Sequence, residues 1–281
     1  MRCKGKIHVT AIFIIRNFLK DGVSRLISKN NQIQSYLDRI GFKGSLDGSA
    51  KTLADLQERH LFTVPYENLD ILEHRSLSLD PQDLYEKIVT RQRGGYCFEL
   101  NALFGWLLRE LGYTVTDLVA RFWRDEPDLP PKRRHHVLKV EAEGIDYLCD
   151  VGVGGIVPCR PISFNEGLEQ QQGEECYRLE KDLDYGWALC EQKNKGWNRI
   201  YSFTEEPQLP KDYLFASFWC ENAPDSIFNK YPIVAIRTPE GRCTISDREF
   251  RIFTSAGVKT FTPQTDEAYK SALLLYFGIE L

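Results

Sequence analysis

Several features that would place a chain in a specialised class are missing from this sequence of 281 residues. No apolar run approaches the roughly 18 residues of a membrane span, and the apolar stretch near the start, residues 9–15, is too short. There is no basic surplus either, because 36 lysines and arginines face 40 aspartates and glutamates, for a net charge of -4. We therefore expect neither a membrane protein nor a nucleic-acid partner. The local basic cluster at residues 132–134 is interpreted as solvated loop charge.

The sequence also lacks a recognisable metal-binding motif of cysteines and histidines. The eight cysteines include no C-x-x-C pair, and the chain has only five histidines, so we expect neither a structural zinc site nor a metal cofactor. A chain of this length can bury a large core without disulfides, and no secretory leader is recognisable. We therefore expect reduced thiols and a cytoplasmic location.

The most informative stretch covers residues 93–101 and reads Arg-Gly-Gly-Tyr-Cys-Phe-Glu-Leu-Asn. Its glycine pair makes a turn that delivers Cys97 to the start of an apolar segment. Beyond Cys97 the apolar residues recur every three or four positions, as in a buried helix, and Gly112 follows as a helix stop. These recurring residues are Leu100, Leu103, Phe104, Leu107, Leu108 and Leu111. Cys97 is thus predicted in or next to the first helical turn.

This position favours a reactive thiol at Cys97. A helix N-terminus presents unpaired N–H groups and the positive end of the helix dipole, which stabilise a thiolate. A free thiol with a pKa of about 8.5 is only a few per cent ionised at neutral pH, so a lowered pKa turns an inert cysteine into a nucleophile. The alternative is that Cys97 is simply a small buried apolar residue.

The hydrophobic pattern changes along the chain and indicates an α+β fold. Helical periodicity dominates residues 31–112, whereas short runs of β-branched and aromatic residues predict a mostly antiparallel sheet or small barrel over residues 113–220. A third part, residues 221–281, combines strands with a helix at the end. Residues 1–30 form a basic N-terminal extension outside this pattern.

Local signals place several element boundaries. Asp80 followed by Pro81 predicts a helix N-terminus, and Gly278 predicts the end of a final helix over residues 266–277. The expected strands cover residues 114–123, 135–142, 146–151, 176–180, 186–191 and 197–203 in the second part, and residues 232–238, 242–246 and 248–253 in the third.

A cysteine nucleophile needs a base to hold its proton and a third group to orient that base. The only histidines after Cys97 are His135 and His136, at the start of a predicted strand. The turn at residues 143–144 sends the chain back, and counting from it places these histidines opposite Asp150 to within about one pair. Neighbouring strand side chains point to opposite faces, so only one histidine can share a site with Cys97. Taken alone, each is equally an ordinary strand residue.

Three stretches together resemble the signature motifs of the arylamine N-acetyltransferases. They are residues 93–101, the segment Pro-Tyr-Glu-Asn-Leu-Asp at residues 65–70, and Asp-Val-Gly-Val-Gly at residues 150–154. The resemblance covers residues 31–281.

The intervals between the motifs also fit the family, because 38 positions separate Cys97 from His135 and 15 separate His135 from Asp150. The family's motif of histidine, two residues, leucine and then valine is matched by His135, Leu138 and Val140. The resemblance therefore selects His135 rather than its neighbour.

The resemblance implies a helical bundle, an antiparallel β-barrel and an α/β lid, with a thiol-protease-like core of Cys97, His135 and Asp150. It also implies an acyltransferase with a ping-pong mechanism. Cys97 takes the acetyl group from the donor substrate acetyl-CoA and then passes it to a small-molecule arylamine or hydrazine, without a metal. His135 would keep Cys97 ionised and carry protons, and Asp150 would fix the imidazole tautomer.

The resemblance assigns roles to nearby residues as well. Glu67 and Arg93 would form an ion pair that holds the glycine turn. The aromatic residues Tyr66, Phe98 and Phe122 would line the substrate site, although each is equally an ordinary core aromatic.

Two further assignments concern the acceptor and CoA. The family usually has phenylalanine where this chain has Val153, so Val153 would give the acceptor pocket a different shape, or it is a plain core residue. The CoA site of relatives borders the barrel and the lid, and Ser217 and Gly241 lie in the matching region. No phosphate-cradling motif is visible in the sequence.

Another class of function shares the same residues. A thiol hydrolase or an amide synthase acting on another acyl donor would also acylate Cys97 and differ only in the group that takes the acyl unit. A degenerate binding protein is less favoured, because all three residues of the expected triad are present.

Overall fold

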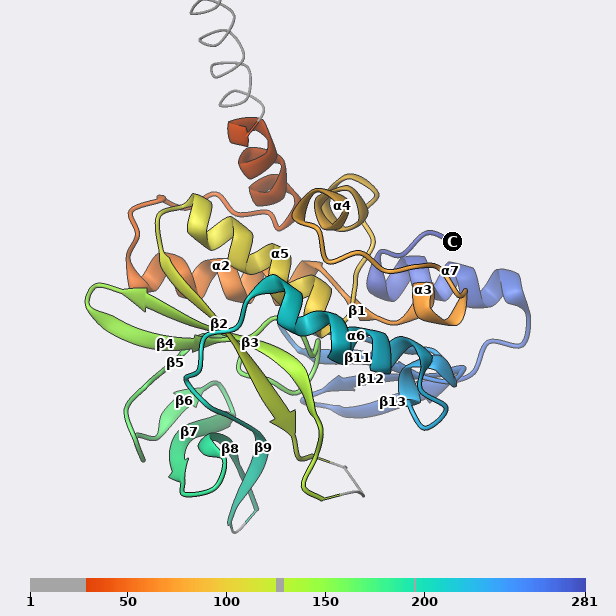
Figure 1. The fold of residues 1–281 in the computed structure, drawn as a ribbon. Helices are drawn as coiled ribbons and strands as arrows, with labels where there is room; N and C mark the ends of the chain where they lie inside the picture. The colour runs from red at the N-terminus through yellow and green to blue at the C-terminus, as the bar shows by residue number, and fades with distance from the viewer. Residues whose placement is uncertain (1–28, 125–128, 195) are drawn as a thin grey trace, which may run out of the picture.

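The computed structural model describes residues 29–124, 129–194 and 196–281. It contains two antiparallel sheets beside a group of helices. Figure 1 shows the larger sheet at the lower left, the smaller one at the lower right and the helices above them. Within the described residues, no helix is both long and apolar enough to cross a membrane.

The first part of the described chain is helical, as the periodicity predicts. Its helices are residues 29–39, α2 (Ala50–Thr63), α3 (Leu69–Leu72), α4 (Pro81–Tyr85) with the π-helical turn η1 (Glu86–Thr90), and α5 (Cys97–Glu110). The predicted start of α4 is confirmed, because the Asp80 side chain accepts the backbone N–H of Gln82. Helix α5 is the centre of the core, since its apolar side chains, among them Leu100 and Phe104, are fully buried.

The larger sheet confirms the expected antiparallel barrel-like part. Its strands are β2 (Thr114–Phe122), β3 (Arg133–Ala142), β4 (Ile145–Cys149), β5 (Ile162–Ser163), β6 (Gln170–Gln172), β7 (Glu175–Asp182), β8 (Gly186–Lys193) and β9 (Gly196–Phe203), in the order β5-β4-β3-β2-β9-β8-β7-β6. The edge strands β5 and β6 meet through one side chain. The Gln170 amide accepts the Ser163 N–H at 2.9 Å and donates to the Ser163 carbonyl at 3.2 Å. The sheet therefore curls almost into a closed barrel.

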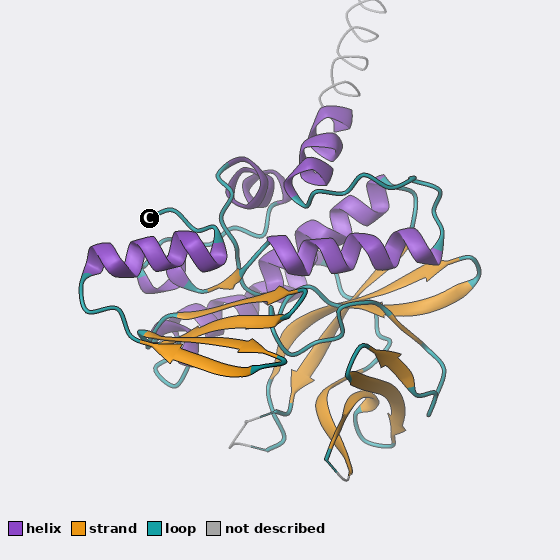
Figure 2. Ribbon diagram, turned by 180° about the vertical axis from the view of Figure 1, so that it is seen from behind, coloured by secondary structure: helices purple, strands orange, loops and turns teal. Residues whose placement is uncertain are grey.

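The smaller sheet lies at the other end of the molecule. Its strands are β1 (Tyr66–Glu67), β10 (Ile233–Thr238), β11 (Gly241–Ser246), β12 (Glu249–Thr254) and β13 (Gly257–Phe261), in this order. Helix α7 (Asp266–Phe277) covers one face of this sheet, as Figure 2 shows from behind. The Phe250 ring is stacked on Phe261 at 4.9 Å and packs against Phe277. The predicted stop at Gly278 is confirmed by its left-handed φ of 66°.

The two-residue strand β1 joins distant parts of the chain. On one side Tyr66 pairs with Ala235 and Glu67 with Val234 of β10. On the other side Tyr66 forms a parallel bridge to Gly95, in the turn before Cys97. The smaller sheet is therefore attached directly to the segment that carries Cys97.

The connection between the two sheets contains helices that the sequence analysis does not predict. They are the 3-10 turn η2 (Pro210–Asp212), α6 (Tyr213–Asn222) and the 3-10 turn η3 (Ile227–Asn229). Strand β13 and the short strands β1, β5 and β6 are also unpredicted. One predicted boundary is wrong in a way that matters for the site: β4 ends at Cys149, so Asp150 belongs to the loop that follows and not to the strand.

Candidate active site

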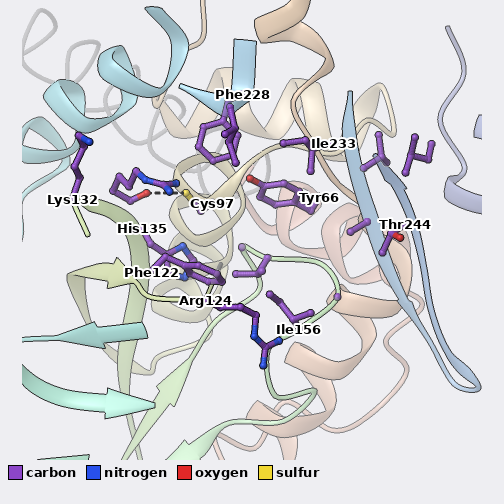
Figure 3. Close-up of a pocket in the computed structure, with 18 of the residues that line it drawn as sticks. Tyr66, Cys97, Phe122, Arg124, Lys132, His135, Ile156, Phe228, Ile233 and Thr244 are labelled. Atoms are coloured by element: carbon purple, nitrogen blue, oxygen red, sulfur yellow. Dashed lines mark hydrogen bonds between the residues drawn. The ribbon is translucent and has the colours of Figure 1, made fainter. Parts of the chain in front are cut away.

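Cys97 is the first residue of α5, as predicted, and its side chain lies at the edge of a cavity. The preceding Tyr96 is extended, and the Glu99 carboxylate accepts its backbone N–H at 3.0 Å, which fixes the start of the helix. Only 3% of Cys97 is exposed, and its Sγ lies 3.7 Å from the carbonyl oxygen of Arg134, the contact drawn as a dashed line in Figure 3.

The glycine turn before Cys97 is held against the segment that contains β1. Gly95 donates its N–H to the Pro65 carbonyl at 3.3 Å, and Glu67 donates its N–H to the Gly95 carbonyl at 2.8 Å. A Cβ atom on Gly94 would lie 2.0 Å from the Pro65 carbonyl oxygen, so this close approach needs glycine. The packing of the turn against Pro65 thus explains why the motif has glycine at position 94.

A buried cluster of charges supports this turn from behind. Arg93 pairs with Glu67 at 2.8 Å, which confirms the expected ion pair, and with Asp70 at 3.2 Å. Lys87 lies 2.8 Å from Asp70 and 2.8 Å from Glu99. Burial raises the pKa of Glu99 to about 7, although Lys87 opposes the shift. Removing one partner of a buried ion pair leaves the other charge uncompensated and costs about 3–5 kcal/mol, so each charge behind the turn requires the others.

His135 and Asp150 lie together next to Cys97. The pairing of Leu138 with Cys149 brings the end of β4 back beside β3, and His135 Nε2 lies 2.8 Å from Asp150 Oδ2. The second Asp150 oxygen, Oδ1, accepts the Gly152 N–H at 2.8 Å. Both side chains of the pair are almost fully buried.

Asn101 supports this pair and was not singled out in the sequence. Its Nδ2 donates to Asp150 Oδ1 at 2.9 Å and to the His136 carbonyl at 2.7 Å, and its Oδ1 accepts the Val151 N–H at 2.9 Å. Asn101 follows Cys97 by four residues on the same helix, so both side chains lie on one face. That spacing is the signal that could have identified it.

The charges at the site favour a proton on His135. Burial by itself would lower the pKa of His135, but the Asp150 carboxylate outweighs it and raises the pKa to about 10. For Cys97, burial raises the pKa of the thiol, whereas the neighbouring His135 lowers it. Since His135 Nε2 is bound to Asp150, Nδ1 is the ring nitrogen available to Cys97.

The neighbouring His136 points to the opposite face of β3, as strand alternation predicts. Its Nε2 lies 3.0 Å from Asp117 Oδ1, and its ring is stacked on Tyr213 of α6 at 4.2 Å. The other oxygen of Asp117 is paired with Arg109. His136 therefore belongs to the packing between β3 and α6 and lies outside the Cys97 site.

Cys97 and His135 line a cavity of about 620 Å³, a typical volume for a small-molecule site. Its walls come from α5, β2, β3, the loop after Asp150, the segment around Phe228 and strands β10 and β11. In Figure 3 the Tyr66 ring lies between Cys97 and Thr244, with its hydroxyl end toward Cys97.

The residues expected to line a substrate site divide into two groups. Tyr66, Phe122 and Val153 all line the cavity that contains Cys97, and Phe122 also packs edge-on against His135 at 5.6 Å. Phe98, by contrast, is fully buried between the rings of Tyr96 and Tyr213 and does not reach the described cavity wall. The direction of the first turn of α5 explains this difference, because it sends Cys97 toward the cavity and Phe98 into the core.

The structure does not bring the residues expected near CoA to the described cavity wall. Ser217 is buried, hydrogen-bonds to the Tyr96 hydroxyl and donates to Glu221 at 2.7 Å. Gly241 begins β11 with φ at 153°, and a Cβ there would lie 2.3 Å from the Phe253 carbonyl oxygen. Ser217 thus serves as a buried hydrogen-bonding residue, and Gly241 allows a close approach of two backbone segments.

Basic side chains at the cavity correct one expectation. Lys132 and Arg134 were interpreted as solvated loop charges, but both line the cavity. The Lys132 ammonium lies 5.0 Å from the centre of the Trp219 ring, and the Arg134 guanidinium lies 5.6 Å from that of Phe228. A cation over the face of an aromatic ring is attracted by the negative charge density of the ring.

Among the described residues, no group of three or more histidine, cysteine, aspartate or glutamate side chains could hold a metal ion. The described cysteines are free thiols: Cys97, Cys149, Cys159, Cys176, Cys190, Cys220 and Cys243. The reactive groups that the site brings together are the Cys97 thiol, the His135 imidazole and the Asp150 carboxylate.

A cysteine at a helix N-terminus, beside a histidine oriented by an aspartate, is the geometry of enzymes that use a thiol nucleophile. The family model described as N-acetyltransferase matches residues 49–281. The chain belongs to the arylamine N-acetyltransferase family of acyltransferases.

Individual relatives support this assignment. The arylamine N-acetyltransferase of Mycobacterium tuberculosis is 36% identical over 254 residues, covering 89% of each sequence. The structure of the Salmonella typhimurium enzyme superimposes with a TM-score of 0.84 at 28% identity, covering 88% of this chain and 91% of that one. The Mycobacterium marinum enzyme in complex with CoA superimposes with a TM-score of 0.82 at 34% identity, covering 88% and 92%.

Proposed function

We propose that this chain transfers the acetyl group of acetyl-CoA to an arylamine or arylhydrazine through an acetyl-Cys97 intermediate. The observation that carries the proposal is the hydrogen bond of 2.8 Å between His135 Nε2 and Asp150 Oδ2, beside a cysteine at the start of α5. This arrangement supplies a nucleophile, a proton carrier and a group that orients the carrier.

In the first half-reaction the Cys97 thiolate, paired with the His135 imidazolium, attacks the thioester carbonyl carbon of acetyl-CoA. The N–H of Cys97 is at the first helical position, where a helix leaves its N–H groups without intrahelical partners, and it is available to the developing oxyanion. The bond from the carbonyl carbon to the CoA sulfur then breaks. His135 Nδ1 protonates the departing sulfur, and CoA leaves as a thiol.

In the second half-reaction the amine nitrogen attacks the carbonyl carbon of acetyl-Cys97. The now neutral His135 takes a proton from the nitrogen, and Asp150 stabilises the resulting imidazolium. The bond from the carbonyl carbon to Cys97 Sγ breaks, which releases the acetylated amine and restores the thiolate. The donor and the acceptor use the same thiol one after the other, so a single cavity is sufficient.

The relatives support the choice of substrates. The relatives from Mycobacterium tuberculosis and Escherichia coli are called arylamine N-acetyltransferases, and the structure from Mycobacterium marinum is described as a complex with CoA. The cavity of this chain also combines aromatic walls at Tyr66 and Phe122 with basic groups at Lys132 and Arg134. Aromatic walls suit a planar amine, and basic groups suit the phosphates of CoA.

The test separates transfer from hydrolysis. The protein is incubated with acetyl-CoA and examined by intact mass, and a single acetyl adduct located on Cys97 is expected, absent from the Cys97→Ala variant. CoA release is then followed with and without an aromatic amine. Acceleration by the amine with formation of the N-acetyl product supports the proposal. An acetyl adduct whose turnover is indifferent to amine would show a thioester hydrolase instead.

A further inference from the structure

Asn68 belongs to the motif at residues 65–70 but has no part in the chemistry described so far. Its side chain is buried, with 1% exposed. Asparagine at the N-cap of a helix usually caps that helix, and Asn68 stands at the N-cap of α3, yet its side chain makes no capping hydrogen bond there. The side chain is directed elsewhere.

The amide of Asn68 binds a segment more than 150 positions later in the sequence. Its Nδ2 donates to the Phe228 carbonyl at 2.7 Å and to the Tyr231 carbonyl at 2.9 Å. Its Oδ1 accepts the Ile233 N–H at 2.8 Å. Both donors and the acceptor of the amide are used, and aspartate, which has no donor, could not replace it.

The segment held in this way forms part of the cavity wall. Phe228 and Ile233 both line the cavity, and Figure 3 shows them above Cys97 and Tyr66. The Phe228 ring also packs edge-on against Tyr96, the residue immediately before Cys97, at 6.2 Å. A shift of residues 228–233 would therefore change the shape of the cavity beside the thiol.

The residues next to Asn68 are fixed to the other side of the same cavity. Tyr66 bridges Gly95, and Glu67 pairs with Arg93 in the buried charge cluster, so this strand is attached to the turn that delivers Cys97. Asn68 follows directly and binds the wall. The short segment at residues 66–68 thus sets the distance between the nucleophile and the Phe228 wall.

We propose that Asn68 is a positioning residue that selects ring-bearing acceptors by holding the wall of Phe228 and Ile233 in place beside Cys97. The inference rests on the proposed function and refines it on the acceptor side. A planar aromatic amine reaches this wall, whereas hydrazine without a ring is too small to need it. The donor acetyl-CoA is larger than aniline and shares the cavity, but both acceptors react with the same acetyl-Cys97, so the ratio of their kcat/KM values reports the second half-reaction alone.

The experiment compares Asn68→Ala and Asn68→Asp with wild type and with Thr52→Val. The control variant also removes side-chain hydrogen bonds, from Thr52 Oγ1 to the Ser45 carbonyl at 3.0 Å and to Asp47 Oδ1 at 2.7 Å, but Thr52 does not line the described cavity. Acetylation of Cys97 is measured by rapid quench and mass, and kcat/KM is measured for aniline and for hydrazine. Wild-type transfer to aniline tests the proposed function by itself, and the ratio between the acceptors tests Asn68.

Both Asn68 variants are expected to lower the ratio of kcat/KM for aniline to that for hydrazine by at least about fivefold, whatever the change in Cys97 acetylation. Amide hydrogen exchange of residues 227–233 should become faster in these variants and stay unchanged in Thr52→Val. An equal loss for both acceptors, which leaves the ratio at its wild-type value, overturns the proposal. Failure of both variants to fold, while Thr52→Val folds, would also overturn it and leave Asn68 with a purely structural role.

Discussion

His135 and His136 are neighbours in sequence, both buried, and each has its Nε2 close to an aspartate, at 2.8 and 3.0 Å. The pKa values of the two rings are nevertheless shifted in opposite directions. The pKa of His135 is raised to about 10, because Asp150 outweighs the effect of burial. The pKa of His136 is lowered, because burial outweighs the attraction of Asp117.

The groups around the two rings account for the difference. Besides Asp150, the neighbouring Cys97 raises the pKa of His135. The charge of His135 in turn lowers the pKa of His136, whose partner Asp117 is also paired with Arg109. The other hydrogen bonds of Asp150 come from neutral donors, the Asn101 amide and the Gly152 N–H. Contact with an aspartate alone therefore does not decide whether a buried histidine carries a proton.

The strongest test of this comparison replaces each histidine by alanine. His135→Ala should lower the rate of Cys97 acetylation by about 10²–10⁴-fold, because the proton carrier is lost, whereas His136→Ala should keep most of the activity and lose mainly stability. Iodoacetamide alkylation of Cys97 as a function of pH should lose its low-pH limb in the His135 variant alone. The opposite result would reverse the roles assigned to the two rings.

Asn101→Ala tests whether neutral donors keep Asp150 in place. The change removes one of the hydrogen bonds to Asp150 and leaves the buried Val151 N–H without its partner, a loss of about 1–3 kcal/mol, so both half-reactions should slow by about 5- to 150-fold. Rapid-quench acetylation and steady-state amine kinetics give the two rates. The matched variant Gln57→Ala, which removes a buried amide bonded to the Pro158 carbonyl at 3.0 Å, should leave the rates nearly unchanged. Equal effects of both variants would argue against a specific role of Asn101.

The two histidines should also affect stability with opposite pH dependence. His135 has a folded pKa above its ordinary value of 6.5, so its stabilising contribution is fully present below pH 6.5 and is lost as the pH rises through about 10. His136 has a folded pKa below 6.5, so its contribution is present above pH 6.5 and is lost as the pH falls through the lowered value.

Urea unfolding between pH 5 and pH 10 measures this difference. The free-energy loss caused by His135→Ala should shrink toward high pH, and that caused by His136→Ala should shrink toward low pH. Parallel pH profiles for the two variants would mean that the rings share one protonation state.

The smallest expected effect concerns Val153, another residue of the cavity wall. Val153 is half-buried and lines the cavity, so Val153→Phe should add an aromatic contact worth roughly 0.5–1.5 kcal/mol to a planar amine. The value of kcat/KM for arylamines should rise by about three- to tenfold, with acetylation by acetyl-CoA unchanged. Stopped-flow acetylation and amine kinetics on one preparation measure both. Equal losses in the two, with a lower Tm, would show overpacking instead.

Local pattern and register placed the reactive groups but did not choose between the two histidines. The helix start at Cys97, the opposite directions of His135 and His136, and the position of these histidines opposite Asp150 to within about one pair follow from short-range periodicity and from one hairpin. The family resemblance added the choice of His135 and the pair of Glu67 with Arg93.

Contacts between distant segments escaped prediction. Nothing in the sequence around Asn68 indicates that its partners lie near Phe228, and the sequence around Lys87 does not show that it meets Glu99. Helix α6 was missed because its many aromatic residues resemble a strand. Phe98 was expected at the cavity because of the family resemblance, but successive residues of a helix point about 100° apart, and Phe98 is directed into the core while Cys97 faces the cavity.

The pairing of β1 with β10 has a consequence for synthesis of the protein. A chain is made from its N-terminus, so Cys97, His135 and Asp150 leave the ribosome well before Ala235 and Val234, the partners of Tyr66 and Glu67. Strand β1 is therefore synthesised long before its partner strand β10, and contacts between residues so distant in sequence form slowly. The cavity wall beside Cys97 therefore cannot be completed until residues 228–235 have been synthesised, although the residues of the Cys97 site are present much earlier.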